Sequence, residues 1–335
     1  MKARDYYNST IPEGHRGQSY QKIYLRDIFE KHNDREGRKI FNHVPNLSND
    51  RLLENLINSL IIINSGAIKE RLQNVFVAKV HDFVANASAV EATSYYGDLV
   101  YFYVGLSDVC FQFTTLFSEL LYVRKSSDKG ATHRSEALIS FFVNIDKFSK
   151  ASRRWRKYGD YIKLQKEDVV ITPFPDVESK AISMACLSDK FILCHEFSHH
   201  LLGHTCKPDV GSNLLNTLPD ECKAWLKSSV EHKKEFQADA LALIIMFGAP
   251  NNEKKIRDMG IEIALGSLLT LFTLKLLDDD PDKAGYQHPP INERILYCKR
   301  MLKTKLAEEV VNEIYDDIEG LYNIIDNTRN NSKNA

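Results

Sequence analysis

The sequence predicts an α+β fold that is predominantly α-helical, with a small β-sheet beside one central helix. Apolar residues recur at helical spacing through most of the 335 residues. Clear β character is confined to 161–172, is strongest at 168–172, and ends at Pro173 and Pro175. The composition, 43% hydrophobic and 27% charged, is that of a globular protein with a buried core.

The N-terminal region, 1–130, is expected to be helical and has no role that its residues indicate. Residues 1–48 are polar and interrupted by glycine and proline, which indicates an irregular arm with one short helix near 24–31. An N-cap at 48–50 then begins a helix with apolar residues at helical spacing, and a second helix is expected at 67–85.

Two segments in the middle of the chain raise the questions of membrane and nucleic-acid binding. The aromatic-rich segment 99–123 has Asp108 near its middle, which favours a buried core helix over a membrane span. A helix is expected at 134–150, followed by a basic cluster at 147–157. Nucleic acid could use that cluster, but a solvated helix face fits better a chain whose net charge is −1.

Several helices are expected after the central motif, at about 219–247, 252–277, 290 onward and 310–325. The stretch 263–274 is apolar on all sides, but charged residues bracket only these twelve positions, so we expect a buried helix and no transmembrane segment. The polar tail, 326–335, is expected to be disordered.

The compartment is expected to be the cytoplasm. The N-terminus has no apolar stretch after its charges, unlike a secretory signal. The six cysteines are scattered without a Cys-x-x-Cys pair, which favours reduced thiols.

One pattern, His-Glu-x-x-His, dominates the chemistry of the sequence. On a helix, His195 and His199 lie one turn apart on one face and can bind a single metal ion. Glu196 lies beside the first ligand, where it can reach a water molecule. Ser188 or Asp189 is the expected N-cap of this helix. A metal site needs at least a third ligand.

The third ligand is expected on a second helix, in Glu-Phe-Gln-Ala-Asp. Glu235 and Asp239 are four residues apart and share one helical face. Glu235 can bind the metal through its carboxylate, and Asp239 can accept the free ring N–H of a ligand histidine. The apolar residues that follow, 240–247, indicate that this helix faces the core.

These two motifs, followed by His-Pro-Pro-Ile-Asn-Glu-Arg-Ile at 288–295, resemble the glutamate-ligand zinc metalloproteases, or gluzincins. The order of motifs is most similar to the CAAX prenyl endopeptidase and HtpX-type group, over about 188–300. The resemblance implies a zincin-like core at 131–325, a Zn²⁺ cofactor, and a histidine, His288, that holds the substrate or the developing oxyanion. Because that group carries transmembrane helices and none is expected here, a soluble relative is implied.

The expected function is zinc-dependent hydrolysis of a peptide bond in a protein substrate. His195, His199 and Glu235 hold the metal, and Glu196 acts as general base. The tail Leu-Leu-Gly-His after the motif also resembles soluble regulators of the ImmA/IrrE type and Lit-type phage-exclusion peptidases, which cleave one chosen protein. Other divalent ions could replace zinc. A non-catalytic zinc protein is a further alternative, and the N-terminal region could bind a regulatory partner or cover the cleft.

Overall fold

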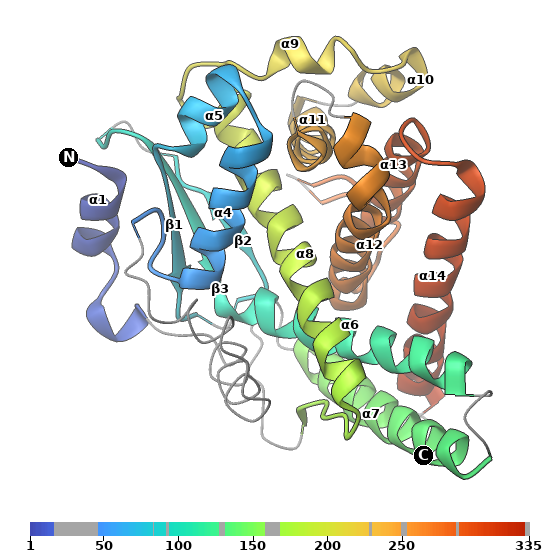
Figure 1. Ribbon diagram of the computed structural model, residues 1–335. Helices are drawn as coiled ribbons and strands as arrows, with labels where there is room; N and C mark the ends of the chain where they lie inside the picture. Colours follow the sequence, from blue (N-terminus) through green and yellow to red (C-terminus); the bar gives the residue numbers. More distant parts are fainter. Residues whose placement is uncertain are drawn as a thin grey trace.

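The computed structural model in Figure 1 is built mainly of α-helices, with one small sheet at one side, which confirms the predicted class. It describes residues 1–16, 46–82, 84–91, 94–126, 131–157, 168–227, 230–248, 253–285 and 288–331. The expected short helix at 24–31 lies outside these ranges.

The sheet has three strands in the order β1-β3-β2. The strands are β1 (Val75–Val80), β2 (Ala87–Ala89) and β3 (Asp98–Tyr103). β1 runs parallel to β3, with Val75 opposite Asp98, and β2 runs antiparallel to β3, with Ala89 opposite Val100. β2 therefore forms one edge of the sheet.

Successive residues of β1 fill two different cores, as the pleat requires. Phe76 and Ala78 pack with Tyr7 of α1 (Ala3–Thr10), whereas Val75 and Val77 join the main core. The helices α4 (Arg51–Ile63) and α5 (Gly66–Leu72) precede the sheet, and the carboxylate of Asp50 caps α4 as predicted.

The position of the sheet corrects three expectations. The helix expected at 67–85 ends at Leu72, because the β-branched run that follows forms β1. The helix expected at 99–123 begins only at Val104, after β3. The strand expected at 168–172 does not form in that stretch, where adjacent valines are both buried; the rest of it, 161–167, lies outside the described residues.

The remaining helices surround α8, which crosses the centre of the molecule in Figure 1. It packs against α6, α11 and α12. The long helices are α6 (Val104–Lys125), α7 (Ala131–Lys157), α8 (Pro175–Leu201), α11 (Val230–Phe247), α12 (Glu253–Leu277), α13 (Ile291–Lys303) and α14 (Glu308–Asn331). Shorter pieces are η1 (Glu13–His15), α9 (Ser212–Leu215), α10 (Asp220–Lys223) and η4 (Ala224–Lys227).

Helix α8 begins much earlier than expected. Pro175 occupies its first turn, where a missing N–H costs nothing, and Asp176 and Glu178 suit the positive end of the helix dipole. The expected N-cap residues, Ser188 and Asp189, are buried inside the helix instead. Their side chains form hydrogen bonds with other helices. These polar residues therefore resemble an N-cap in the sequence although no helix begins there.

Two further corrections concern the C-terminal half. The helix expected at 219–247 is divided into α10, η4 and α11. The tail expected to be disordered from 326 is helical to Asn331, because Ile325 and Arg329 are buried on the inner face of α14. Residues 332–335 lie outside the described residues.

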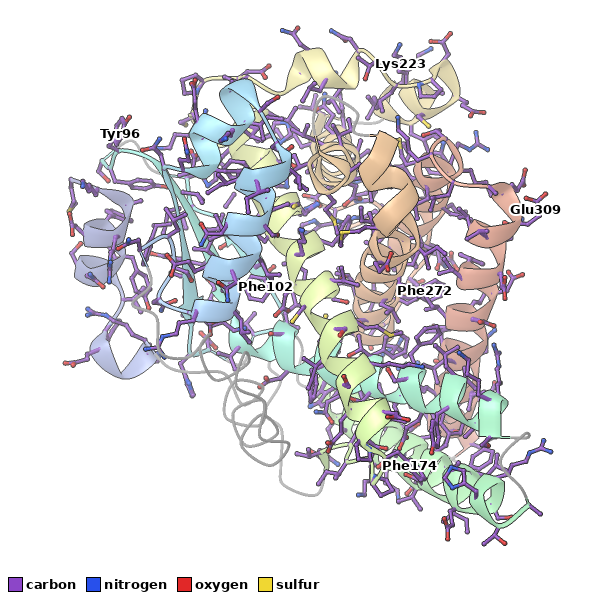
Figure 2. The ribbon with its side chains drawn as sticks, viewed as in Figure 1. Tyr96, Phe102, Phe174, Lys223, Phe272 and Glu309 are labelled. Atoms are coloured by element: carbon purple, nitrogen blue, oxygen red, sulfur yellow. The ribbon has the colours of Figure 1, made fainter. Side chains whose placement is uncertain are left out.

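The main core is continuous from Leu53 to Ile325. In Figure 2, Phe102 of β3 and Phe272 of α12 point into this core, whereas Tyr96 and Glu309 lie at the periphery. The core crosses residue 130, and the sheet lies within the N-terminal region that we expected to be helical. A division of the chain at that residue stays a prediction.

One segment of α12, Met259–Leu277, is long and apolar enough by composition to cross a membrane. In the fold, 67% of its apolar window is buried, and the helix packs against α8, α13 and α14. Core helices of this kind pass the same test, so the expected absence of a transmembrane segment stays a prediction.

The basic cluster at 147–157 makes bonds within the chain. Arg156 donates hydrogen bonds to the carbonyl groups of Lys275 and Leu276 at the end of α12, and Arg154 pairs with Asp168. These two arginines are thus engaged within the fold, and the expected absence of nucleic-acid binding stays a prediction.

Candidate active site

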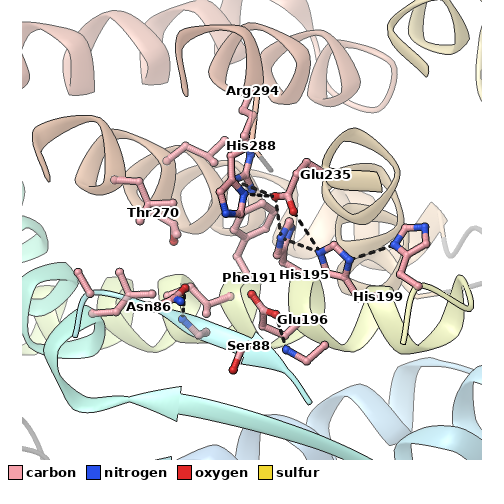
Figure 3. Close-up of a pocket in the computed structure, with 18 of the residues that line it drawn as sticks. Asn86, Ser88, Phe191, His195, Glu196, His199, Glu235, Thr270, His288 and Arg294 are labelled. Carbon is pink, nitrogen blue, oxygen red and sulfur yellow. Dashed lines mark hydrogen bonds and ion pairs between the residues drawn. The ribbon is translucent and has the colours of Figure 1, made fainter. Parts of the chain in front are cut away.

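Helix α8 presents the two motif histidines to one cleft. His195 and His199 are one turn apart, and their Nε2 atoms are 3.3 Å from each other. Both imidazoles are largely buried: the side chain of His195 is 10% exposed and that of His199 is 14% exposed. Figure 3 shows the two rings side by side, with Glu196 below them on the same helix.

Helix α11 brings a carboxylate to these rings. Glu235 Oε2 is 3.5 Å from His195 Nε2, and Oε1 is 3.6 Å from His199 Nε2. The structure thus gathers His195, His199 and Glu235 into one group that could hold a metal ion. Tetrahedral zinc, with bonds of about 2.0–2.1 Å, places its ligand atoms about 3.3 Å apart. The three side chains fit a divalent ion of this size.

The charges of the site also fit a divalent cation. Three buried or half-buried carboxylates, those of Glu196, Glu235 and Asp239, meet one guanidinium, that of Arg294. In their ionised forms these groups leave two negative charges in a site of low dielectric. Glu235 Oε2 is buried and has no hydrogen bond of good geometry, although several nitrogens surround it. Such an atom is expected where a ligand to a cation belongs.

Asp239 lies one turn after Glu235 and reaches the other nitrogen of His195. Its Oδ1 is 2.9 Å from His195 Nδ1. Burial lowers the pKa of His195, but the bonds to Asp239 and Glu235 outweigh burial and raise the pKa to about 10. The two carboxylates therefore stabilise a positive charge between them, whether a metal ion or a protonated His195 carries it.

Arg294 of α13 is a site residue that the sequence did not reveal. Its Nε and Nη2 donate to the two oxygens of Asp239 at 2.9 and 2.8 Å, and Nη1 is 3.2 Å from Glu235 Oε2. Although burial raises the pKa of Glu235, Arg294 and His195 hold that pKa well below its usual range. The Asn-Glu-Arg-Ile part of the third motif contained this residue, but local spacing gave it no role.

Glu196 faces the edge strand. Its Oε2 accepts a hydrogen bond from the backbone N–H of Ala89 at 2.8 Å, and burial raises the pKa of Glu196. On either side of β2, the carbonyl group of Asn86 accepts a hydrogen bond from Tyr103 N, and Val90 N donates one to Leu99 O. Because pairing alternates, Ala87 and Ala89 direct their backbone groups away from the sheet and toward the cleft.

His288 lies at the rim of the cleft, where its side chain is 63% exposed. Its Nδ1 is 3.3 Å from Glu235 Oε2, so it joins the motif group from above in Figure 3. His204, which follows α8, is a second residue missed at the sequence level. Its Nδ1 is 3.0 Å from His199 Nδ1.

The cleft has a volume of about 320 Å³ and lies between α8, β2, α12 and the start of α13. One side of it is apolar, with Leu106, Phe191, Ile192, Leu271 and Leu274 in its wall. Thr270 and Asn86 face each other across this part of the cleft in Figure 3.

Comparisons with known proteins agree with a hydrolytic site. No curated protein and no solved structure matches the chain. The family model described as peptidase U49 matches residues 109–313, more than half of the chain, and that range contains α8, α11 and the start of α13. The chain belongs to the peptidase U49 family, and its function is that of a peptidase.

Proposed function

We propose that this protein is a zinc-dependent endopeptidase of the gluzincin type. The observation that supports it most is the triangle of ligand atoms from His195, His199 and Glu235, with Glu196 beside it in an open cleft. A structural zinc site closes with four protein ligands, whereas a catalytic site uses three and leaves one position open. For this reason the alternative of a non-catalytic zinc protein is less well supported.

A zinc ion held by these residues would polarise the scissile carbonyl and lower the pKa of a water molecule. Glu196 takes the proton of the attacking water and passes it to the leaving amine nitrogen as the C–N bond breaks. Asp239 orients His195 through Nδ1. His288, exposed at the rim next to Glu235, holds the substrate near its carbonyl.

The edge of β2 that faces the cleft binds the substrate backbone in an extended conformation. Ala87 and Ala89 turn their backbone groups to the cleft, and peptide segments commonly bind by adding a strand to such an edge. The apolar wall formed with Phe191 and Leu271 takes a side chain next to the cleaved bond. Part of the N-terminal region therefore forms one wall of the cleft, and a covering role for the rest of this region stays a prediction.

We place this activity in the cytoplasm. All six cysteines are free thiols, as is usual in a reducing compartment. The alternative, a substrate limited to one chosen protein as in ImmA/IrrE-type or Lit-type peptidases, is tested by the experiment that follows.

The test compares wild-type protein with Glu196→Gln, both reconstituted with Zn²⁺, on a complete cellular protein extract. New protein termini are mapped by mass spectrometry. We expect wild-type termini that a chelator abolishes and that Zn²⁺ restores, and a loss of about 10²–10⁴-fold in rate for Glu196→Gln. Equal cleavage by the two proteins, or cleavage insensitive to a chelator, would contradict the proposal.

A further inference from the structure

His204 holds the nitrogen of His199 that points away from the other site residues. His199 Nε2 faces His195 and Glu235 at 3.3 and 3.6 Å, and its Nδ1 lies 3.0 Å from His204 Nδ1. Both nitrogens of His199 are therefore engaged, one by the site and one by a neutral side chain. Among the described residues, His204 and not an acidic side chain takes the position at His199 that Asp239 takes at His195.

The turn after α8 puts His204 in this position. Gly203 N donates to His200 O at 3.2 Å and His204 N donates to His199 O at 2.9 Å, the two bonds of a Schellman motif. Gly203 has φ +72°, and a Cβ on it would lie 3.2 Å from the carbonyl oxygen of Lys207. A glycine is therefore needed at this position of the Leu-Gly-His sequence. Its backbone conformation turns the chain back, so that His204 lies against the last turn of α8.

The contact fixes how protons are distributed. A hydrogen bond between two imidazole nitrogens needs one N–H and one lone pair. If His199 offers the lone pair of Nε2 to a cation, its proton lies on Nδ1, and His204 must accept it through an unprotonated Nδ1. The proton of His204 then lies on Nε2.

We propose that His204 is a positioning residue that orients His199 and fixes its tautomer by accepting the Nδ1 proton. This inference rests on the proposed metal site. The two ligand histidines thus have unlike supports, a carboxylate for His195 and a neutral imidazole for His199. A neutral acceptor adds no third negative charge to a site whose balance already matches a divalent ion.

The test measures the affinity of purified full-length protein for Zn²⁺ by competition with a chromophoric chelator, without any substrate. Three variants separate hydrogen bonding from packing. In Asn, Oδ1 takes the place of His Nδ1, whereas the amide of Gln reaches only the place of Nε2, and Ala offers no acceptor. We expect His204→Ala and His204→Gln to bind Zn²⁺ about 10–100-fold more weakly, and His204→Asn to stay within a few-fold of wild type.

Two further readouts complete the experiment. The visible spectrum of the Co²⁺-loaded protein should change in the Ala and Gln variants and stay close to wild type in the Asn variant. His133→Ala is the matched control, because His133 bonds Tyr122 on a distant helix pair and should leave Zn²⁺ affinity unchanged. Urea unfolding of the metal-free variants shows whether each one is folded.

The inference is overturned if His204→Asn binds Zn²⁺ as weakly as His204→Ala, or if all three variants bind like wild type. Its failure differs from failure of the proposed peptidase function. If only His204→Asn keeps the wild-type affinity for Zn²⁺ but the protein cleaves no substrate, the role of His204 is supported and the proposed peptidase function is contradicted. A chelator-sensitive peptidase whose zinc affinity ignores His204 would overturn the inference alone.

Discussion

The guanidinium of Arg294 binds the carboxylate of Asp239 through two hydrogen bonds, at 2.9 and 2.8 Å. Both groups are buried, and the remaining Nη1 of Arg294 lies 3.2 Å from Glu235. One residue of α13 therefore compensates both carboxylates that α11 directs toward α8. The site depends on three helices, and removal of the arginine leaves two buried carboxylates without their guanidinium partner.

We expect Arg294→Ala to lower the free energy of unfolding by about 3–5 kcal/mol, the usual cost of breaking a buried ion pair. Arg294→Lys should recover only part of this loss, because an ammonium cannot make the paired bonds to Asp239. Urea unfolding of the metal-free proteins measures both values. Arg300→Ala, an exposed arginine on the same helix, is the control and should change stability by less than about 0.5 kcal/mol. A stable Arg294→Ala protein would show that the pair contributes little.

The sequence was most informative where the chemistry is local. His195, His199, Glu235 and Asp239 occur as pairs four residues apart on helices, so their shared faces follow from helix geometry alone. The meeting of the two pairs, inferred from motif order, is what the structure shows. Arg294 is 55 residues from Asp239, and no periodicity links them. His204 depends on the turn at Gly203, whose conformation a single glycine in a sequence does not specify.

The strands of the sheet were not predicted from the sequence, for a different reason. β1 alternates between two cores, so every residue of it is buried and no polar face marks it as a strand. Its apolar residues continue the spacing of α5 closely enough to suggest one helix. Val169 and Val170, in contrast, favour a strand by propensity, but both side chains are buried in a segment that pairs with no strand in the described part of the chain. Tertiary packing decided both cases.

The close approach of α8 and α12 depends on Gly266. A Cβ at this position would lie 2.7 Å from both Cβ and the carbonyl oxygen of Leu187. We expect Gly266→Ala to cost about 1–3 kcal/mol in unfolding free energy, because the backbone of α8 must shift. Gly320→Ala is the matched control: Gly320 lies inside α14 with nothing within 4 Å, so Ala should stabilise by about 0.5–1 kcal/mol. Thermal and urea unfolding measure the change in unfolding free energy for both variants. A Gly266→Ala protein that is more stable than wild type would contradict this account of the helix crossing.

The free energy of unfolding should depend on pH through Asp189. This carboxyl group is buried in α8 and accepts a hydrogen bond from Ser107, which in turn accepts one from Lys79. Burial raises the pKa of Asp189 to about 6, against the opposing effects of Lys79 and Ser107. Between about pH 4 and 6 the folded protein keeps a proton that the unfolded chain loses.

It follows that stability falls as pH rises through this window, by about 3 kcal/mol from this group. Asp189→Asn should remove that contribution, so the difference between wild type and variant should change by this amount between pH 4 and pH 7. Urea unfolding of both metal-free proteins at several pH values measures it. Parallel curves for the two proteins would mean that Asp189 has a similar pKa in the folded and unfolded states.

The edge strand offers a test of substrate binding that uses proline as a probe. Ala89 N donates to Glu196 and faces the cleft, whereas the alternation of pairing turns the backbone of Ser88 toward Tyr101 of β3. Proline removes one N–H and is tolerated in strands only where that group is outside the ladder.

We therefore expect Ala89→Pro to keep the fold and its Zn²⁺ affinity while kcat/KM falls for a substrate identified by terminus mapping. The reason is that Glu196 loses the N–H that its carboxylate accepts, and the proposed substrate strand loses the same N–H at the edge of β2. Ser88→Pro, one residue away, should instead lower the unfolding free energy, since it breaks the pairing of β2 with β3. Full cleavage by Ala89→Pro would exclude this N–H from substrate binding, and equal stability of the two variants would contradict the register of the edge strand.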